Sequence, residues 1–176
     1  VSFTGLSLTQ SQLDGLEISM SGDAGGRTYY VAALYAQITY TASPSVAISL
    51  STDGSVDFGI QQLNTTNDTT LTGINDAEIV SVDSGPADLD IKSSAFSEGT
   101  NTWSLGGSNG ADQVYWQFSK DGSNWSDFAV ADTNYVFDTN VSQGNTRSLY
   151  LRLTTPVSTS SYNQFSSTVT ILASTP

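Results

Sequence analysis

The chain has 176 residues, of which 17 are acidic, five are basic and 50 are Ser or Thr, and it contains no His and no Cys. The lack of imidazole and thiol groups excludes Ser-His-Asp and Cys-His catalysis, disulfide bonds and the usual ligands of zinc or copper. The net charge of −12 argues against nucleic acid as a partner, and no apolar run is long enough for insertion into a membrane.

Alternation of apolar and polar residues, the period of a β-strand, dominates the first half of the chain. The predicted strands there cover residues 2–8, 16–20, 27–41, 45–51, 56–63 and 78–82. The segment Asp83-Ser84-Gly85-Pro86 interrupts this pattern, because Gly and Pro break regular structure. We therefore predict a first β-sandwich module over residues 1–84 and a second over residues 86–176.

In the second half, the predicted strands are shorter and more evenly spaced. They cover residues 87–91, 100–105, 112–119, 126–130, 135–138, 147–154 and 165–173. Seven short strands in about 90 residues match the strand count of an immunoglobulin-like sandwich. The expected inward-facing residues are Val114, Trp116 and Phe118, then Leu149, Leu151 and Leu153, then Val169, Ile171 and Ala173. The predicted fold class is thus all-β, with two immunoglobulin-like antiparallel β-sandwich modules.

Two segments share the pattern S-x-D-G-S followed by D-F, at residues 51–58 and 119–128. Asp-Gly between alternating apolar runs predicts a hairpin turn, because Gly accepts the positive φ that such turns need. The repeat indicates either two related modules or independent use of the same turn.

Acidic residues at three places could bind calcium, which prefers oxygen ligands. Asp53, Ser55 and Asp57 resemble half of a calcium loop but lack its remaining ligands, and Asp121, Ser123 and Asp127 form a looser version. Asp83, Asp88 and Asp90 lie at the predicted module boundary, where two modules could both supply ligands. The alternative is that these carboxylates are solvated turn residues, and no other cofactor is predicted.

Aromatic residues outside the predicted core could stack on sugar rings. The main candidates are Tyr115, Trp125 and Tyr150, and the others are Tyr135, Tyr162 and Trp103. Aromatic residues are, however, also common in strands for stability alone. Glycans could also be attached to the chain, since N-x-[ST] sequons occur at Asn64, Asn67, Asn124 and Asn140, all in predicted loops.

The second half of the chain contains the pattern W-x-x-S-x-D-G-x-x-W, within the stretch Val114-Tyr-Trp-Gln-Phe-Ser-Lys-Asp-Gly-Ser-Asn-Trp-Ser-Asp-Phe128. A predicted late strand follows at residues 148–154. This combination resembles immunoglobulin-like modules of prokaryotic secreted proteins. The resemblance covers the second half of the chain, and its motif is structural. Because such modules occur in surface layers, adhesins, filaments and polysaccharide hydrolases, it implies a location more than an activity.

These observations predict an extracellular or cell-surface structural protein rather than an enzyme. Its expected partners are copies of itself in a filament or surface layer, with glycans as a further candidate partner. Neither nucleic acid nor a membrane is expected. The first predicted strand, with Val1, Phe3, Leu6 and Leu8, could complete the sheet of a neighbouring copy, because an added strand seals an open sheet edge. The alternatives are that this strand pairs within its own sheet, or that the protein is a carbohydrate-binding module using Trp125 and its aromatic neighbours.

Overall fold

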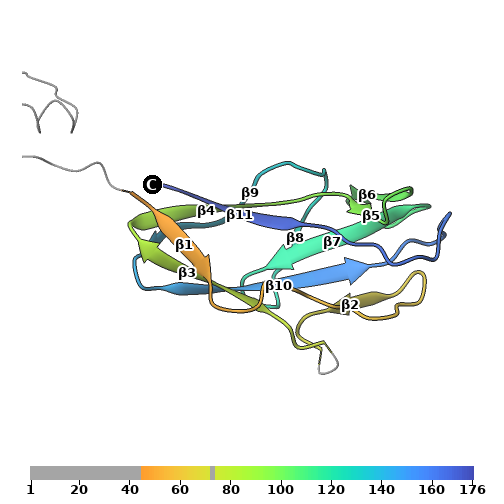
Figure 1. Cartoon of the computed structure of the whole chain (residues 1–176), viewed down its shortest axis with the longest axis horizontal. Coiled ribbons are helices and arrows are strands. Elements are labelled where there is room, and N and C mark those ends of the chain that lie inside the picture. The colour runs from red at the N-terminus through yellow and green to blue at the C-terminus, as the bar shows by residue number, and fades with distance from the viewer. Residues whose placement is uncertain (1–44, 72–73) are drawn as a thin grey trace, which may run out of the picture. The chain divides into compact units, whose positions relative to one another are not determined.

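The computed structural model describes residues 45–71 and 74–176, which belong to one compact unit and form strands without helices. The strands, shown in Figure 1, are β1 (Ala47–Leu50), β2 (Thr66–Asp68), β3 (Glu78–Ser84), β4 (Pro86–Ser93), β5 (Phe96–Ser97), β6 (Thr102–Gly106), β7 (Gln113–Ser119), β8 (Ser126–Asp127), β9 (Tyr135–Ser142), β10 (Thr146–Thr154) and β11 (Val169–Ser174). The prediction of an all-β protein is confirmed for this part of the chain.

The larger of two sheets has the strand order β1-β3-β10-β7-β6-β5, with β2 paired to β10 and β8 paired to β7. Its strands are antiparallel except that β6 runs parallel to β7, with Ser104 opposite Gln113. The expectation of purely antiparallel sheets is therefore wrong at this pair. Because the pair is parallel, the chain must return to the starting end of β6, and it does so within the six residues 107–112. Asp112 in this connection has a φ of +46°, and its carbonyl accepts a hydrogen bond from the Ser104 N–H.

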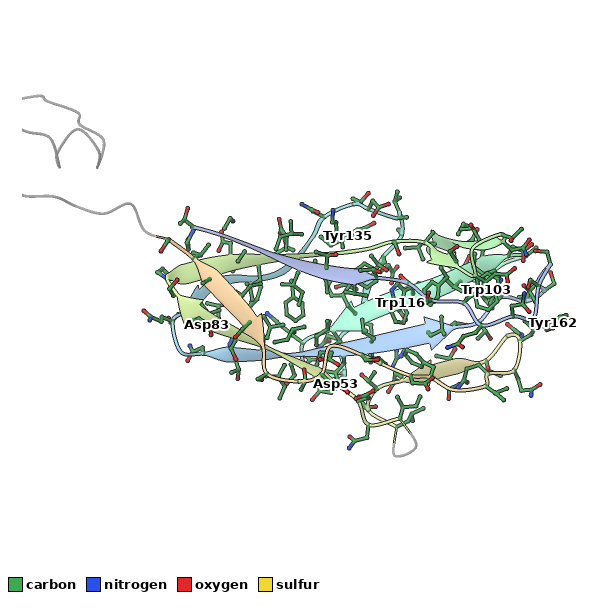
Figure 2. All side chains as sticks on the ribbon, in the orientation of Figure 1. Asp53, Asp83, Trp103, Trp116, Tyr135 and Tyr162 are labelled. Atoms are coloured by element: carbon green, nitrogen blue, oxygen red, sulfur yellow. The ribbon has the colours of Figure 1, made fainter. Side chains whose placement is uncertain are left out.

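The smaller sheet has the order β11-β4-β9 and is antiparallel. One hydrophobic core lies between the two sheets, and Trp116 lies in it between the layers (Figure 2). The small sheet contributes Ala87, Leu89, Ile91, Phe137 and Val141, and the large sheet contributes Val82, Val114, Trp116, Phe118, Leu149, Leu151 and Leu153. The predicted inward faces of β7 and β10 are thus confirmed, whereas Val169, Ile171 and Ala173 of β11 pack against the core but are only half-buried.

The predicted module boundary lies at the turn between β3 and β4. Gly85 has a φ of +96°, which lets the chain pass within one residue from the large sheet to the small sheet. Strand β3, on one side of this turn, pairs with β10 near the other end of the chain. The segment 83–86 is therefore a tight turn within one compact unit, and β1, β2 and β3 complete a sheet whose other strands come from residues 86–176.

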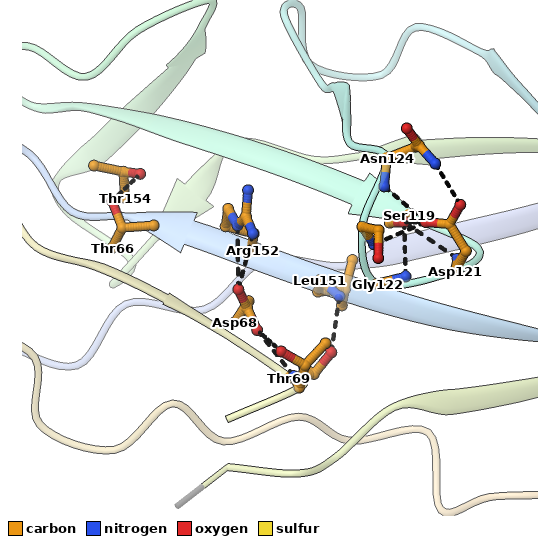
Figure 3. Close-up of polar contacts among 12 residues, drawn as sticks. Thr66, Asp68, Thr69, Ser119, Asp121, Gly122, Asn124, Leu151, Arg152 and Thr154 are labelled. Carbon is orange, nitrogen blue, oxygen red and sulfur yellow. Dashed lines mark hydrogen bonds and ion pairs between the residues drawn. The ribbon is translucent and has the colours of Figure 1, made fainter. Parts of the chain in front are cut away.

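The two Asp-Gly turns differ. Asp121 and Gly122 connect β7 to β8, which pair as the predicted hairpin. The Asp121 carboxylate accepts hydrogen bonds from the backbone and side chain of Asn124, then from Ser123 and Ser119, and these hold its pKa far below the usual range (Figure 3). The hairpin predicted at Asp53-Gly54 is wrong, because β1 pairs with β3 and residues 56–63 contain no strand.

The strands predicted at residues 2–8, 16–20 and 27–41 lie outside the described residues. Within the described part, no helix is long and apolar enough to cross a membrane.

Candidate functional site

A shallow apolar groove lies where the two sheets meet at β1 and β11. It has a volume of about 160 Å³, and we call it the edge groove; its lining residues are Ile48, Ser49, Leu50, Val80, Val169 and Ile171. Both bordering strands end the strand order of their sheets: among the described strands, β1 pairs with β3 alone and β11 with β4 alone. The groove therefore combines apolar side chains with two sheet edges.

Apart from Val80, which is 1% exposed, the side chains around the edge groove are more exposed than those in the rest of the core. Leu50 is 51% exposed, and Val169 and Ile171 are half-buried, whereas Leu89 and Ile91 of the neighbouring strand β4 are fully buried. An apolar face left partly open beside unpaired backbone groups is a place where an additional strand can bind. Val1, Phe3, Leu6 and Leu8, which are predicted to supply such a strand, lie outside the described residues.

Three of the candidate sugar-binding residues, Tyr115, Trp125 and Tyr150, lie on the outer surface of the large sheet. Tyr115 on β7 and Tyr150 on β10 are both half-buried and face away from the core, since their neighbours Val114, Trp116, Leu149 and Leu151 face inward. Trp125 precedes β8 on the same surface, and the Arg152 guanidinium lies 3.9 Å from the centroid of its ring. We call Tyr115, Trp125 and Tyr150 the outer aromatic face.

Hydrogen bonds fix the orientation of part of this face. The Tyr115 hydroxyl donates to Asp127 Oδ1 at 2.8 Å, and Gln117 Nε2 donates to both of these groups at 2.9 Å. Burial, followed by the hydrogen bond to Asp127, raises the pKa of the Tyr115 phenol, so it stays neutral. The phenol is thus held in one orientation on the surface.

Arg152 connects the outer aromatic face to β2. Its guanidinium donates from Nε and Nη2 to Asp68 Oδ2 at 3.2 and 3.1 Å (Figure 3). Burial works to raise the pKa of Asp68, but hydrogen bonds from Thr70 and Arg152 outweigh it and lower the pKa. Asp68 therefore remains ionised and holds Arg152 against Trp125.

The structure does not gather the predicted calcium ligands Asp83, Asp88 and Asp90. Asp83 is on the large sheet and accepts a hydrogen bond from the Ser49 hydroxyl, while Asp88 is on the small sheet and accepts one from the Asn140 N–H. Asp90, also on β4, is half-buried. Within residues 45–71 and 74–176, these three carboxylates do not form a convergent group.

A different group of carboxylates does converge, and it contains one residue of the predicted half-loop. Oxygens of Asp53, Asp76 and Glu78 lie within 4.8 Å of one another. Asp53 lies on the lower side of the view in Figure 2, away from Asp83. The sequence carried one signal for Glu78: alternation places it on the same face of β3 as the buried residues Val80 and Val82.

Three of the four sequon asparagines, Asn64, Asn124 and Asn140, are exposed, and Asn67 is half-buried. The prediction that all four lie in loops is wrong for Asn67, on β2, and for Asn140, on β9. Asn140 has a φ of +50°. The pairing of β4 with β9 is irregular nearby, so the strand continues through a position that the sequence marks as a turn.

Comparisons of this chain with protein-family models, with curated proteins and with solved structures found no match.

Proposed function

We propose that this protein is a structural subunit of an extracellular filament or surface layer, in which a strand of one copy binds in the edge groove of the next. The observation that carries the proposal is the edge groove itself, where half-exposed apolar residues lie between two edge strands. The composition supports a structural role, because the chain has many hydroxyls and no His or Cys.

The proposed occupant of the groove is the segment that contains Val1, Phe3, Leu6 and Leu8. Its alternating apolar residues would cover Ile48 and Ile171, and its backbone would hydrogen-bond to β1 or β11. The alternation shifts by one residue at Gly5, as a β-bulge allows. Because the donated segment and the acceptor groove are on the same chain, each added copy presents a new acceptor, so the assembly can extend.

Deleting residues 1–8 should leave a folded protein that forms no polymers, as seen by negative-stain electron microscopy. Replacing Leu50 by Lys should also prevent assembly, because it places a charge in the groove at a side chain that is already 51% exposed. Val136→Lys is the matched control, since Val136 is 67% exposed on β9 and does not line the groove. Normal filaments from the deletion variant, or dispersed monomers of the unmodified protein, would contradict the proposal.

We also propose an immunoglobulin-like class for the compact unit. Support comes from its two sheets around one core and from Trp116, which is buried on a central strand. The parallel pairing of β6 with β7 departs from the usual antiparallel arrangement.

A second candidate function is carbohydrate binding by the outer aromatic face, because the structure places Tyr115, Trp125 and Tyr150 on one outward surface. Trp125→Ala should weaken binding in a glycan array by about 1–3 kcal/mol, by analogy with stacking of bases on aromatic side chains. Tyr162→Ala is the control, since Tyr162 is 84% exposed in the loop before β11 (Figure 2). Equal binding by the two variants would refute this candidate.

A further inference from the structure

We propose that Asp53, Asp76 and Glu78 form a calcium-binding site that joins the loop after β1 to the start of β3. The three side chains come from separate places in the chain: Asp53 follows β1, Asp76 lies in the turn before β3, and Glu78 is the first residue of β3. This site is independent of the strand exchange proposed above.

The first observation is the spacing of the carboxylate oxygens, which lie within 4.8 Å of one another. Calcium binds oxygen at about 2.3–2.6 Å, so two oxygens on opposite sides of the ion are separated by about 4.6–5.2 Å. One calcium ion can therefore reach all three carboxylates. Magnesium requires oxygens at about 2.0–2.1 Å in near-ideal octahedral geometry, whereas calcium accepts the flexible coordination that carboxylates from three separate segments offer.

The second observation concerns Glu78, which is only 5% exposed. Its Oε2 accepts hydrogen bonds from the Thr52 hydroxyl and from the Gly54 N–H, but its buried Oε1 has no hydrogen-bond partner. A buried carboxylate oxygen without a partner is costly, because it has lost its water without replacement. A cation at the cluster would supply the missing partner.

The third observation is that no basic side chain among the described residues neutralises the cluster. The ion pairs of the described residues lie elsewhere: Lys120 and Arg147 pair with Asp138, and Arg152 pairs with Asp68. Three carboxylates this close repel one another unless a positive charge lies between them. The donor set is all oxygen in a chain without His or Cys, which favours calcium over zinc or copper.

The local fold holds these groups in place without the ion. The Thr52 hydroxyl donates to Glu78 and accepts a hydrogen bond from the Ile79 N–H at 3.1 Å, so the loop after β1 is fixed against β3. Asp53 Oδ1 accepts a hydrogen bond from the Ser55 N–H at 3.0 Å, which leaves its other oxygen available. Calcium would strengthen this link and stabilise β1, the strand that borders the edge groove.

The test is to measure calcium binding by the full chain, after treatment with a chelator, by isothermal titration calorimetry and by thermal unfolding. We expect one saturable site with a Kd at or below about 1 mM. At a calcium concentration of about 100 times the Kd, the Tm should rise by about 5–10 °C. Absence of saturable binding up to millimolar calcium, or equal affinity for magnesium, would overturn the proposal.

Asp76→Asn separates metal binding from a purely structural role, because it should change the Tm in opposite directions under two conditions. With chelator, the variant should have a higher Tm than the unmodified protein, since one repelling charge is gone. With calcium, it should have a lower Tm and a Kd raised by about tenfold or more, since a charged ligand is lost. Asp57→Asn is the matched control, because it removes an exposed charge from the same loop but not from the cluster. Identical calcium affinities for the two variants would overturn the site.

Discussion

Replacement of Trp116 by Ala should lower the free energy of unfolding by about 3–5 kcal/mol, the usual cost of removing a buried aromatic side chain. Trp116 is 3% exposed, and its ring makes edge contacts with Phe58 and Phe96, at centroid distances of 5.9 and 5.2 Å. Its Nε1–H donates a hydrogen bond of 3.0 Å to the hydroxyl of Ser93, which is fully buried on the small sheet. The substitution therefore removes packing within the core and a polar contact between the two sheets.

Two further variants separate these contributions in guanidinium unfolding followed by circular dichroism. Trp116→Phe keeps an aromatic ring but loses the donor to Ser93, whose hydroxyl still bonds to Ser167. It should therefore recover much of the stability and leave the net cost of one hydrogen bond, about 0.5–1.5 kcal/mol. Trp125→Ala makes the same chemical change on the outer surface and should cost about 1 kcal/mol through its contact with Arg152. Similar losses for Trp116→Ala and Trp125→Ala would show that Trp116 does not connect the two sheets.

The sequence predicts strands well where one face is buried against the core. Val114, Trp116 and Phe118 alternate with less apolar residues. Because one face of β7 is buried against the core, this alternation determines which side chains of the strand point inward. The alternation pattern is a poorer guide to secondary structure where a segment is short or is held by contacts with residues distant in the sequence. Residues 56–63 alternate like a strand, yet Phe58 reaches the core from a loop by contacting Trp116.

Strand pairing is a second property that the local pattern does not contain. The pairing of Arg147 with Val80, and the parallel run of β6 beside β7, depend on contacts between distant segments and on turn geometry. Strands β2 and β5, of three and two residues, are too short to show a period and were not predicted.

The candidate sites follow the same division. Alternation within single strands places Tyr115 and Tyr150 on the outward face, but only the β7–β8 hairpin brings Trp125 beside Arg152. The pairing of β1 with β3 brings together Asp53, Asp76 and Glu78, and no sequence motif predicts that pairing. A charged residue on the buried face of a predicted strand, such as Glu78, is the local signal that a search for such sites can use.

Gly85→Ala should destabilise the protein by about 2–4 kcal/mol, because two separate costs apply at this turn. The φ of +96° lies in a region that residues with a Cβ rarely adopt. A Cβ on residue 85 would also lie 2.7 Å from Cγ1 of Val46, which packs against the core beside β1. Either Val46 or the turn must then move, and both lie where the chain crosses between the sheets.

Gly144→Ala isolates the backbone part of this effect. Gly144 also has a positive φ, +81°, but no atom lies within 4 Å of the position that its Cβ would occupy. It should lose only about 1–2 kcal/mol, the cost of a left-handed backbone conformation. The difference between the two variants in denaturant midpoint thus measures how tightly Val46 packs against the β3–β4 turn. A linker between independent modules would tolerate both substitutions equally, so a larger loss at Gly85 would indicate that residues on the two sides of this turn unfold as one unit.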